Sequence, residues 1–191
     1  MTERSYRVLK AIALIMALSW VTWSLYDFMR TKSPADFAYH AASNYFADGD
    51  YSRALVEYQS ALDVNPGYLP AKRGQAEAFI MLKREREAIA IYRELLARDA
   101  NNAGFYANLG IAYDRLGEHH NALQSYLTAL RLDPEIADGP SWMTRFLRNQ
   151  YDKPPGIAER AKYLQAQLDL PEDQRELRRP EQDQIQQPYK Q

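Results

Sequence analysis

The fold is decided by residues 103–134, AGFYANLGIAYDRLGEHHNALQSYLTALRLDP. Two earlier segments align with this stretch at a fixed spacing of 34 residues and without a gap. Self-similarity at this period indicates stacked structural units. The aligned columns are Ala42, Ala76 and Gly110; Tyr45, Phe79 and Tyr113; Ala54, Ala88 and Ala122; Tyr58, Tyr92 and Tyr126; Ala61, Leu95 and Ala129; Leu62, Leu96 and Leu130; and Pro66, Ala100 and Pro134.

Each unit is predicted to form a hairpin of two helices. Apolar residues spaced three, four and seven apart give one buried stripe on a first helix and another on a second. Small residues let the two helices approach, and aromatic residues fill the space beside them. Gly49 and Gly117 lie between the helices of the outer units, where glycine adopts the left-handed conformation that ends a helix. Lys83 holds this place in the middle unit, so its turn is formed at some cost or differently.

The three units resemble the tetratricopeptide repeat (TPR) family. The resemblance covers Ala35 to about Pro134, with repeats expected at about 35–68, 69–102 and 103–136. It implies an all-α solenoid, because no hairpin buries its hydrophobic face alone and neighbours must stack. The third unit matches the family pattern at Tyr106, Leu109, Gly110, Tyr113, Gly117, Ala122, Tyr126, Ala129, Leu130 and Pro134.

Both ends of the array carry segments suited to cover it. Ser33, Pro34 and Asp36 predict a helix start with an N-cap, a first-turn proline and an acidic third position. Residues 137–170 are expected to form a capping hairpin. Residues 171–191 are charged and rich in glutamine, and are expected to be disordered or to fold only on a partner. The two stripes of the capping hairpin are Trp142, Met143, Phe146, Leu147 and Tyr151, and Ile157, Ala161, Leu164 and Leu168.

Residues 11–29, AIALIMALSWVTWSLYDFM, predict a transmembrane helix. At about 1.5 Å per residue this stretch covers roughly 28 Å, close to the thickness of the hydrocarbon core of a bilayer. Residues 1–10 would then be a short cytoplasmic N-terminus and residues 30–34 a linker. A cleaved signal peptide and a buried core helix are the other interpretations. The length of the apolar run and the bulky aromatic residues at its end argue against a cleaved signal peptide. Its apolar character on every face argues against a buried core helix.

Basic residues beside the apolar run predict its orientation. Arg4, Arg7 and Lys10 precede the run and Arg30 and Lys32 follow it, a margin of one positive charge. This excess favours a cytoplasmic N-terminus with the repeats on the far side of the membrane. In a bacterium, the expected location is therefore the inner membrane, crossed once, with the repeats in the periplasm.

The composition argues against catalysis and against several classes of ligand. With 24 Lys and Arg against 25 Asp and Glu, the net charge of −1 gives no general attraction to nucleic acid. The chain has no cysteine, three histidines and no glycine-rich phosphate loop, so no convergent catalytic set is evident. His119 and His120 point to different sides of a helix and lack a third ligand, and His40 stands alone. We expect no enzyme activity, no metal or other cofactor and no small-molecule substrate.

The resemblance to TPR proteins implies a groove that is lined by the first helices of the units and holds a peptide. Phe46, Ile80, Met81 and Ile111 would form an apolar strip suited to an amphipathic peptide. In the other interpretation, the capping hairpin or the tail covers Ile80, Met81 and Ile111. The implied groove residues are Tyr39, Ser43, Phe46, Ala47, Arg73, Glu77, Ile80, Met81, Ala107, Ile111, Asp114 and Arg115.

One subclass of the family binds acidic C-terminal peptides with a clamp of Lys, Asn and Arg side chains. The resemblance places Tyr39, Ser43, Gly74, Gly104 and Asn108 at the corresponding positions, so only the asparagine is retained. A clamp for the tails of cytosolic chaperones is therefore not expected.

Together these patterns predict a membrane-anchored scaffold or assembly chaperone that binds a peptide or subunit of an envelope complex. Tethering would raise the effective concentration of the groove around membrane-bound clients. Similar anchored proteins serve the maturation of c-type cytochromes, pilus or secretion machinery and the assembly of respiratory complexes. The alternative is a permanent structural subunit that is bound through its apolar helix and its tail. The client and the oligomeric state stay open.

Overall fold

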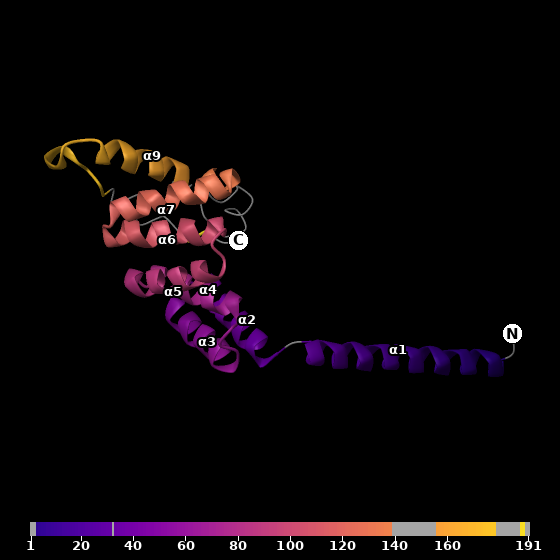
Figure 1. The fold of residues 1–191 in the computed structure, drawn as a ribbon. Coiled ribbons are helices and arrows are strands. Elements are labelled where there is room, and N and C mark those ends of the chain that lie inside the picture. The colour runs from indigo at the N-terminus through magenta and orange to yellow at the C-terminus, as the bar shows by residue number, and fades with distance from the viewer. Residues whose placement is uncertain (1–2, 32, 139–155, 179–187, 190–191) are drawn as a thin grey trace.

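A stack of helical hairpins forms the body of the molecule (Figure 1). The structure, a computed structural model, describes residues 3–31, 33–138, 156–178 and 188–189. One helix projects away from the stack and another covers its far end (Figure 1). The α-helices are α1 (Glu3–Thr31), α2 (Pro34–Ala47), α3 (Tyr51–Val64), α4 (Leu69–Met81), α5 (Glu85–Arg98), α6 (Ala103–Leu116), α7 (His119–Leu132) and α9 (Ile157–Leu168), and the 3₁₀ helices are η1 (Pro134–Asp138) and η2 (Glu172–Gln174).

The all-α solenoid predicted from the repeat is confirmed. Helices pair as α2 with α3, α4 with α5 and α6 with α7, and successive pairs pack through α3 on α4 and α5 on α6. The predicted start of α2 is also present. The Asp36 N–H donates to the Ser33 hydroxyl at 3.2 Å, and the Ser33 N–H donates to the Asp36 carboxylate at 2.8 Å. This reciprocal pair satisfies backbone donors that a helix start otherwise leaves unpaired.

The three turns inside the hairpins share one backbone conformation. Gly49 and Gly117 have φ angles of 80° and 87°, and Lys83 has a φ of 59°. After each of these residues, the next N–H donates at 2.9 Å to the carbonyl five residues earlier. The middle unit therefore makes the same left-handed turn without glycine, at a cost of about 1 kcal/mol.

Small residues bring the helices together, as the aligned columns predict. A Cβ atom at Gly110 would lie 2.6 Å from two ring carbons of Tyr126, and one at Gly74 would lie 2.3 Å from the ring of Tyr58. Each tyrosine ring thus fills the space that the glycine leaves open. The alanines of the small columns have no exposed surface: Ala42, Ala54, Ala76, Ala88 and Ala122.

Helix α9 covers the end of the solenoid by packing against α7 and η1. Ile157, Ala161 and Leu164, members of the second predicted capping stripe, are buried on it. The other predicted stripe, from Trp142 to Tyr151, lies outside the described residues.

The described parts of residues 171–191 differ from the expected disorder. After α9 the chain turns back along that helix, with η2 in between. The Tyr163 hydroxyl donates to the main-chain carbonyl of Glu176, and the Glu176 N–H donates to the Gln167 side chain at 2.6 Å. Composition predicted disorder because the segment has few apolar groups to bury. Hydrogen bonds from α9 side chains to the main chain of the segment hold it in place instead.

Helix α1 is longer than the predicted membrane span and stands apart from the solenoid (Figure 1). It runs through residues 3–10 and ends inside the predicted linker, at Thr31. The large apolar side chains described between Val8 and Tyr26 are exposed. Among the described residues, no helix combines the length and the apolar character that crossing a membrane requires. The transmembrane helix predicted for residues 11–29 is not supported by this finding.

Candidate functional site

The first helices of the three units, α2, α4 and α6, form the surface that we call the inner face. On α2, the predicted groove residues Tyr39 and Ser43 are half-buried. Phe46 is buried, and its ring centroid lies 5.1 Å from that of Tyr51. The Tyr39 ring packs edge-on against Tyr68 at 5.6 Å. Aromatic side chains therefore dominate this end of the inner face.

On α4, charged and apolar groups lie side by side. The Arg73 guanidinium is 3.5 Å from the carboxylate of the buried Glu77. Ile80 is fully buried and Met81 is half-buried. Arg115 of α6 donates to the main-chain carbonyl of Ile80 at 2.8 Å. The side chain of Arg115, which was predicted to line the groove, thus connects α6 to α4.

The predicted apolar strip is not an open surface. Phe46, Ile80 and Ile111 are buried and only Met81 is partly accessible. The alternative, in which the capping hairpin or the tail covers Ile80, Met81 and Ile111, stays a prediction. Whether the strip contributes to binding stays a prediction.

Asn108 is a buried polar residue in the first half of α6, with 1% of its surface exposed. Its Nδ2 donates to the main-chain carbonyl of Tyr189 at 2.9 Å, and its Oδ1 accepts from the Tyr189 N–H at 2.5 Å. One side-chain amide therefore holds both main-chain groups of a single residue. Such pairing reads the backbone, so any residue except proline can occupy the bound position.

Side chains from two further helices complete the surroundings of Asn108. The buried hydroxyl of Tyr92, on α5, lies next to Asn108 and to Glu77 of α4. Burial is the main reason why the pKa of this hydroxyl is well above its usual value, and the negative charge of Glu77 raises the pKa further. Tyr92 therefore stays neutral at physiological pH. Because these three residues come from successive helices, the site exists only when the second and third units are stacked.

Asp114 of α6 is the centre of a buried ion-pair network. The Arg160 side chain donates to its two carboxylate oxygens at 2.6 and 2.9 Å. His119 Nδ1 lies 3.0 Å from the same carboxylate, and the Tyr126 hydroxyl donates to it at 3.4 Å. Arg160 also donates to the Leu177 carbonyl at 3.0 Å. The network thus ties α9 and the segment after it to α6.

Sequence reasoning placed Asp114 in the groove and missed its partner. Arg160 is 3% exposed, three residues after Ile157 and four before Leu164, which are both buried. It therefore lies within the apolar stripe of α9. A charged residue in such a stripe requires a buried partner. The position of Arg160 in the stripe could therefore have predicted such a partner from the sequence.

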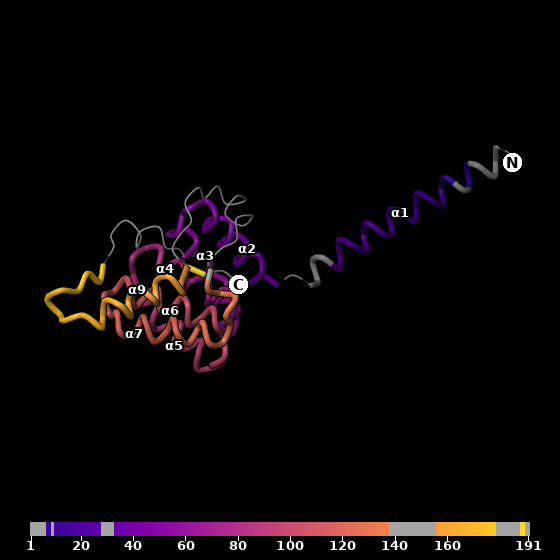
Figure 2. Tube along the Cα trace, turned by 90° about the horizontal axis from the view of Figure 1, so that it is seen from above, coloured from indigo at the N-terminus to yellow at the C-terminus, as the bar shows by residue number. Residues whose placement is uncertain are grey.

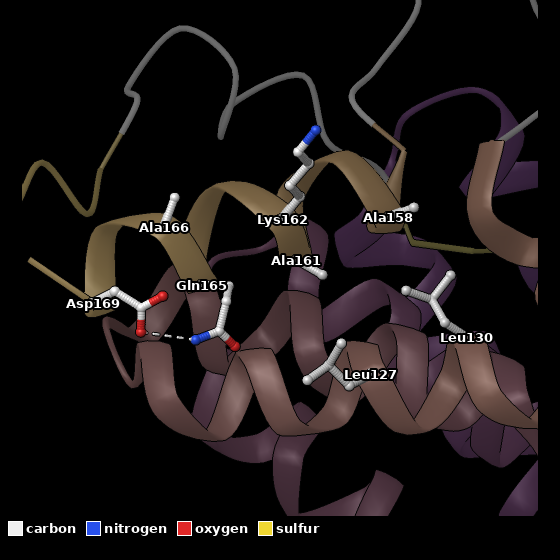
Figure 3. Close-up of a pocket in the computed structure, with 8 residues that line it drawn as sticks. All are labelled: Leu127, Leu130, Ala158, Ala161, Lys162, Gln165, Ala166 and Asp169. Atoms are coloured by element: carbon white, nitrogen blue, oxygen red, sulfur yellow. Dashed lines mark hydrogen bonds between the residues drawn. The ribbon is translucent and has the colours of Figure 1, made fainter.

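A hollow with a volume of about 420 Å³ lies between α7 and α9 (Figure 3). Leu127 and Leu130 of α7 face Ala158 and Ala161 of α9 across it, and Lys162 points away from α7 (Figure 3). The apolar walls of this hollow do not indicate a particular class of ligand. Across the part of the chain that the structure describes, no three His, Asp or Glu side chains gather into a group that could hold a metal ion.

Comparison with known families identifies the repeats. Models described as tetratricopeptide repeat match residues 45–107 and residues 103–136. The general transcriptional corepressor ssn6 of Schizosaccharomyces pombe is 29% identical over 85 residues, which are 44% of this chain. The chain spans 8% of the length of that protein, so the likeness concerns the repeats alone.

Solved structures share the fold at low identity. MamA 41-end from Desulfovibrio magneticus RS-1 has a TM-score of 0.53 at 20% identity, covering 87% of this chain and 93% of that one. The Sgt2 TPR domain from Aspergillus fumigatus has a TM-score of 0.52 at 15% identity, covering 78% and 93%. The first TPR of Spaghetti (RPAP3), bound to HSP90 peptide SRMEEVD, has a TM-score of 0.50 at 21% identity, covering 61% and 88%. At these identities the likeness shows the fold alone.

Proposed function

We propose that this tetratricopeptide repeat protein is a non-catalytic scaffold whose inner face binds an extended segment of another protein. The pairing of Asn108 with both main-chain groups of Tyr189 carries the proposal. A buried amide that reaches a peptide backbone in this way can hold a client irrespective of most of its side chains. Its hydrogen bonds are also stronger than those at a solvated surface, because the local dielectric constant is low.

The rest of the inner face suits a segment that carries aromatic or polar side chains. Tyr39, Ser43 and Arg73 are half-buried on α2 and α4, so each offers part of its surface to a ligand. The Spaghetti TPR binds an HSP90 peptide. Only the asparagine of the five clamp positions is retained in this chain, and we therefore propose recognition of a main chain in place of an acidic tail.

The proposed client is a peptide segment or subunit of a membrane or envelope complex. The alternative, a permanent structural subunit held through α1 and the C-terminal segment, is favoured by the exposure of the apolar side chains of α1. Quantitative mass spectrometry of complexes purified in mild detergent separates the two. A scaffold or chaperone gives substoichiometric partners, whereas a permanent subunit gives one complex at fixed stoichiometry.

Membrane attachment through residues 11–29 is also a proposal, with the N-terminus in the cytoplasm and the repeats in the periplasm. It is supported by the exposed apolar side chains of α1, such as Leu14, Trp20 and Leu25, whose transfer into lipid is favourable. We expect native membranes to retain the full chain during extraction with alkaline carbonate. Recovery of the chain in the supernatant would contradict the attachment.

Photo-crosslinking at the inner face tests the proposed function. We expect p-benzoylphenylalanine at Tyr39 to form adducts with the client in living cells, because Tyr39 is aromatic and partly accessible on α2. The matched control carries the same group at Gln124, an exposed residue on the second helix of the third unit. Adducts of one protein at position 39 and none at position 124 would support the proposal. Equal adducts at both positions, or adducts at 124 alone, would contradict it.

A further inference from the structure

We infer that the C-terminal segment of the chain is an intramolecular ligand of the inner face, and that a client must displace it from Asn108. This inference rests on the proposed function, because displacement matters only if the inner face binds a client. It concerns the described parts of the segment, residues 171–178 and 188–189.

The described parts of the segment lie at two places along α6. Arg178 Nη2 is 3.3 Å from the position that a Cβ of Gly117 would take, at the C-terminal end of this helix. Tyr189 is bonded to Asn108, in the first half of the helix. The two described parts of the segment therefore lie next to different ends of α6, Arg178 at its C-terminal end and Tyr189 in its first half. Figures 1 and 2 both draw residues 188–189 as a short yellow stretch beside α6.

Both described parts are anchored to the folded body. Arg160, fixed by its ion pair with Asp114, donates to the Leu177 carbonyl at 3.0 Å. The side chains of Leu177 and Tyr189 pack against the larger hydrophobic core, which includes Ile111 and Leu164. These anchors keep the Tyr189 main chain close to Asn108, and a tethered ligand of this kind has an effective concentration on the order of millimolar.

Occupancy of Asn108 is exclusive. Its Oδ1 accepts the Tyr189 N–H and its Nδ2 donates to the Tyr189 carbonyl, so a client main chain cannot make this pair of bonds at the same time. The apparent affinity for a client is the intrinsic affinity multiplied by the fraction of molecules whose site is free. A partner that draws the C-terminal segment away would therefore open the inner face to the client.

A peptide added in trans tests this competition on the full-length protein. The probe is a fluorescent peptide with the sequence of residues 179–191, RPEQDQIQQPYKQ, and the readout is fluorescence anisotropy. Tyr189→Pro removes the N–H that Asn108 accepts, and we expect this chain to bind the probe about tenfold more tightly than the wild type. Tyr189→Phe keeps the N–H and the ring, and should bind the probe like the wild type. Adding Asn108→Ala to Tyr189→Pro should abolish the gain.

Equal affinity of the wild type and Tyr189→Pro for the probe would overturn the inference, and so would tight binding that survives Asn108→Ala. The first comparison needs no change at Asn108, so it holds even if that substitution disturbs folding. Helicity and melting temperature of Tyr189→Pro, followed by circular dichroism, are expected to match the wild type closely. The photo-crosslinks from Tyr39 test the proposed function separately. Adducts at position 39 without competition at Asn108 would support the proposed scaffold and contradict the proposal of an intramolecular ligand.

Discussion

Replacing Asp114 by asparagine is expected to lower the free energy of unfolding by about 3 kcal/mol or more, because the Arg160 charge then stays buried without its counter-ion. Asp114 and Arg160 are 5% and 3% exposed, so water does not screen the loss. At this chain length the loss corresponds to a fall of roughly 6–12 °C in melting temperature. Because α9 is attached to α6 through this pair, we expect its amides to lose hydrogen-exchange protection before those of α2 to α5.

Two further variants separate the buried pair from charge in general. Glu172→Gln removes a carboxylate that is 92% exposed, at 3.8 Å from Arg175, and is expected to change stability by less than about 0.5 kcal/mol. Asp114→Leu combined with Arg160→Met removes both buried charges and should recover most of the loss. A melting temperature of Asp114→Asn within a degree of that of the wild type would show that the network does not attach α9 to the solenoid.

The same network predicts sensitivity to acid. Burial by itself would raise the pKa of Asp114, but hydrogen bonds from His119 and Arg160 lower it below the ordinary carboxyl value. Since the folded-state pKa is the lower one, the stabilisation is complete above about pH 4 and is lost as the pH falls through the folded-state pKa. Melting curves between pH 7 and pH 2 should show this loss for the wild type and much less of it for Asp114→Asn.

Gly110→Ala is expected to destabilise the third unit by about 2 kcal/mol. The new Cβ would lie 2.6 Å from the ring of Tyr126, a fully buried residue whose hydroxyl donates to Asp114 at 3.4 Å. Overpacking on this scale costs about 3 kcal/mol, and the better helix propensity of alanine offsets about 1 kcal/mol. Chemical unfolding followed by circular dichroism measures the difference.

The control for this substitution is Gly67→Ala. A Cβ at Gly67 meets its nearest atom at an ordinary 3.5 Å, so we expect a change within about 0.5 kcal/mol. An equal effect of the two substitutions would show that the close approach of α6 and α7 is not set by Gly110.

The hairpins could be predicted from the sequence because their determinants are local and repeated. Gly110 and Tyr126 recur as a small and an aromatic column, and the turn residues Gly49, Lys83 and Gly117 share one spacing. The periodicity of the stripes also placed Ile157 and Leu164 on a buried face of α9. In all of these cases the contacts lie within one unit or between neighbours, so a pattern at fixed spacing encodes them.

The contacts that organise the candidate site have no such pattern. Asp114 and Arg160 are 46 residues apart, and Asn108 and Tyr189 are 81 residues apart. Each contact is made once, so no column repeats it. The composition of the C-terminal segment predicted disorder because composition reflects only how much apolar area the segment can bury. It contains no information on the hydrogen bonds that main-chain groups of the described part of the segment make with Asn108, Tyr163 and Arg160. The sequence left open whether the apolar strip is exposed or covered, because the resemblance assigns positions to a helix face without stating what covers them.

The claim that the inner face holds a peptide by its main chain at Asn108 is tested most directly by NMR of the side-chain amide of this residue. The ¹⁵N-labelled Tyr189→Pro chain is titrated with the unlabelled peptide of residues 179–191, and Asn108→Gln assigns the signals. We predict that the two Asn108 amide protons move, on saturation, from their positions in the variant to those of the wild type. Asn108 signals that stay in place while other signals of the chain shift would contradict the claim, because the peptide would then bind elsewhere.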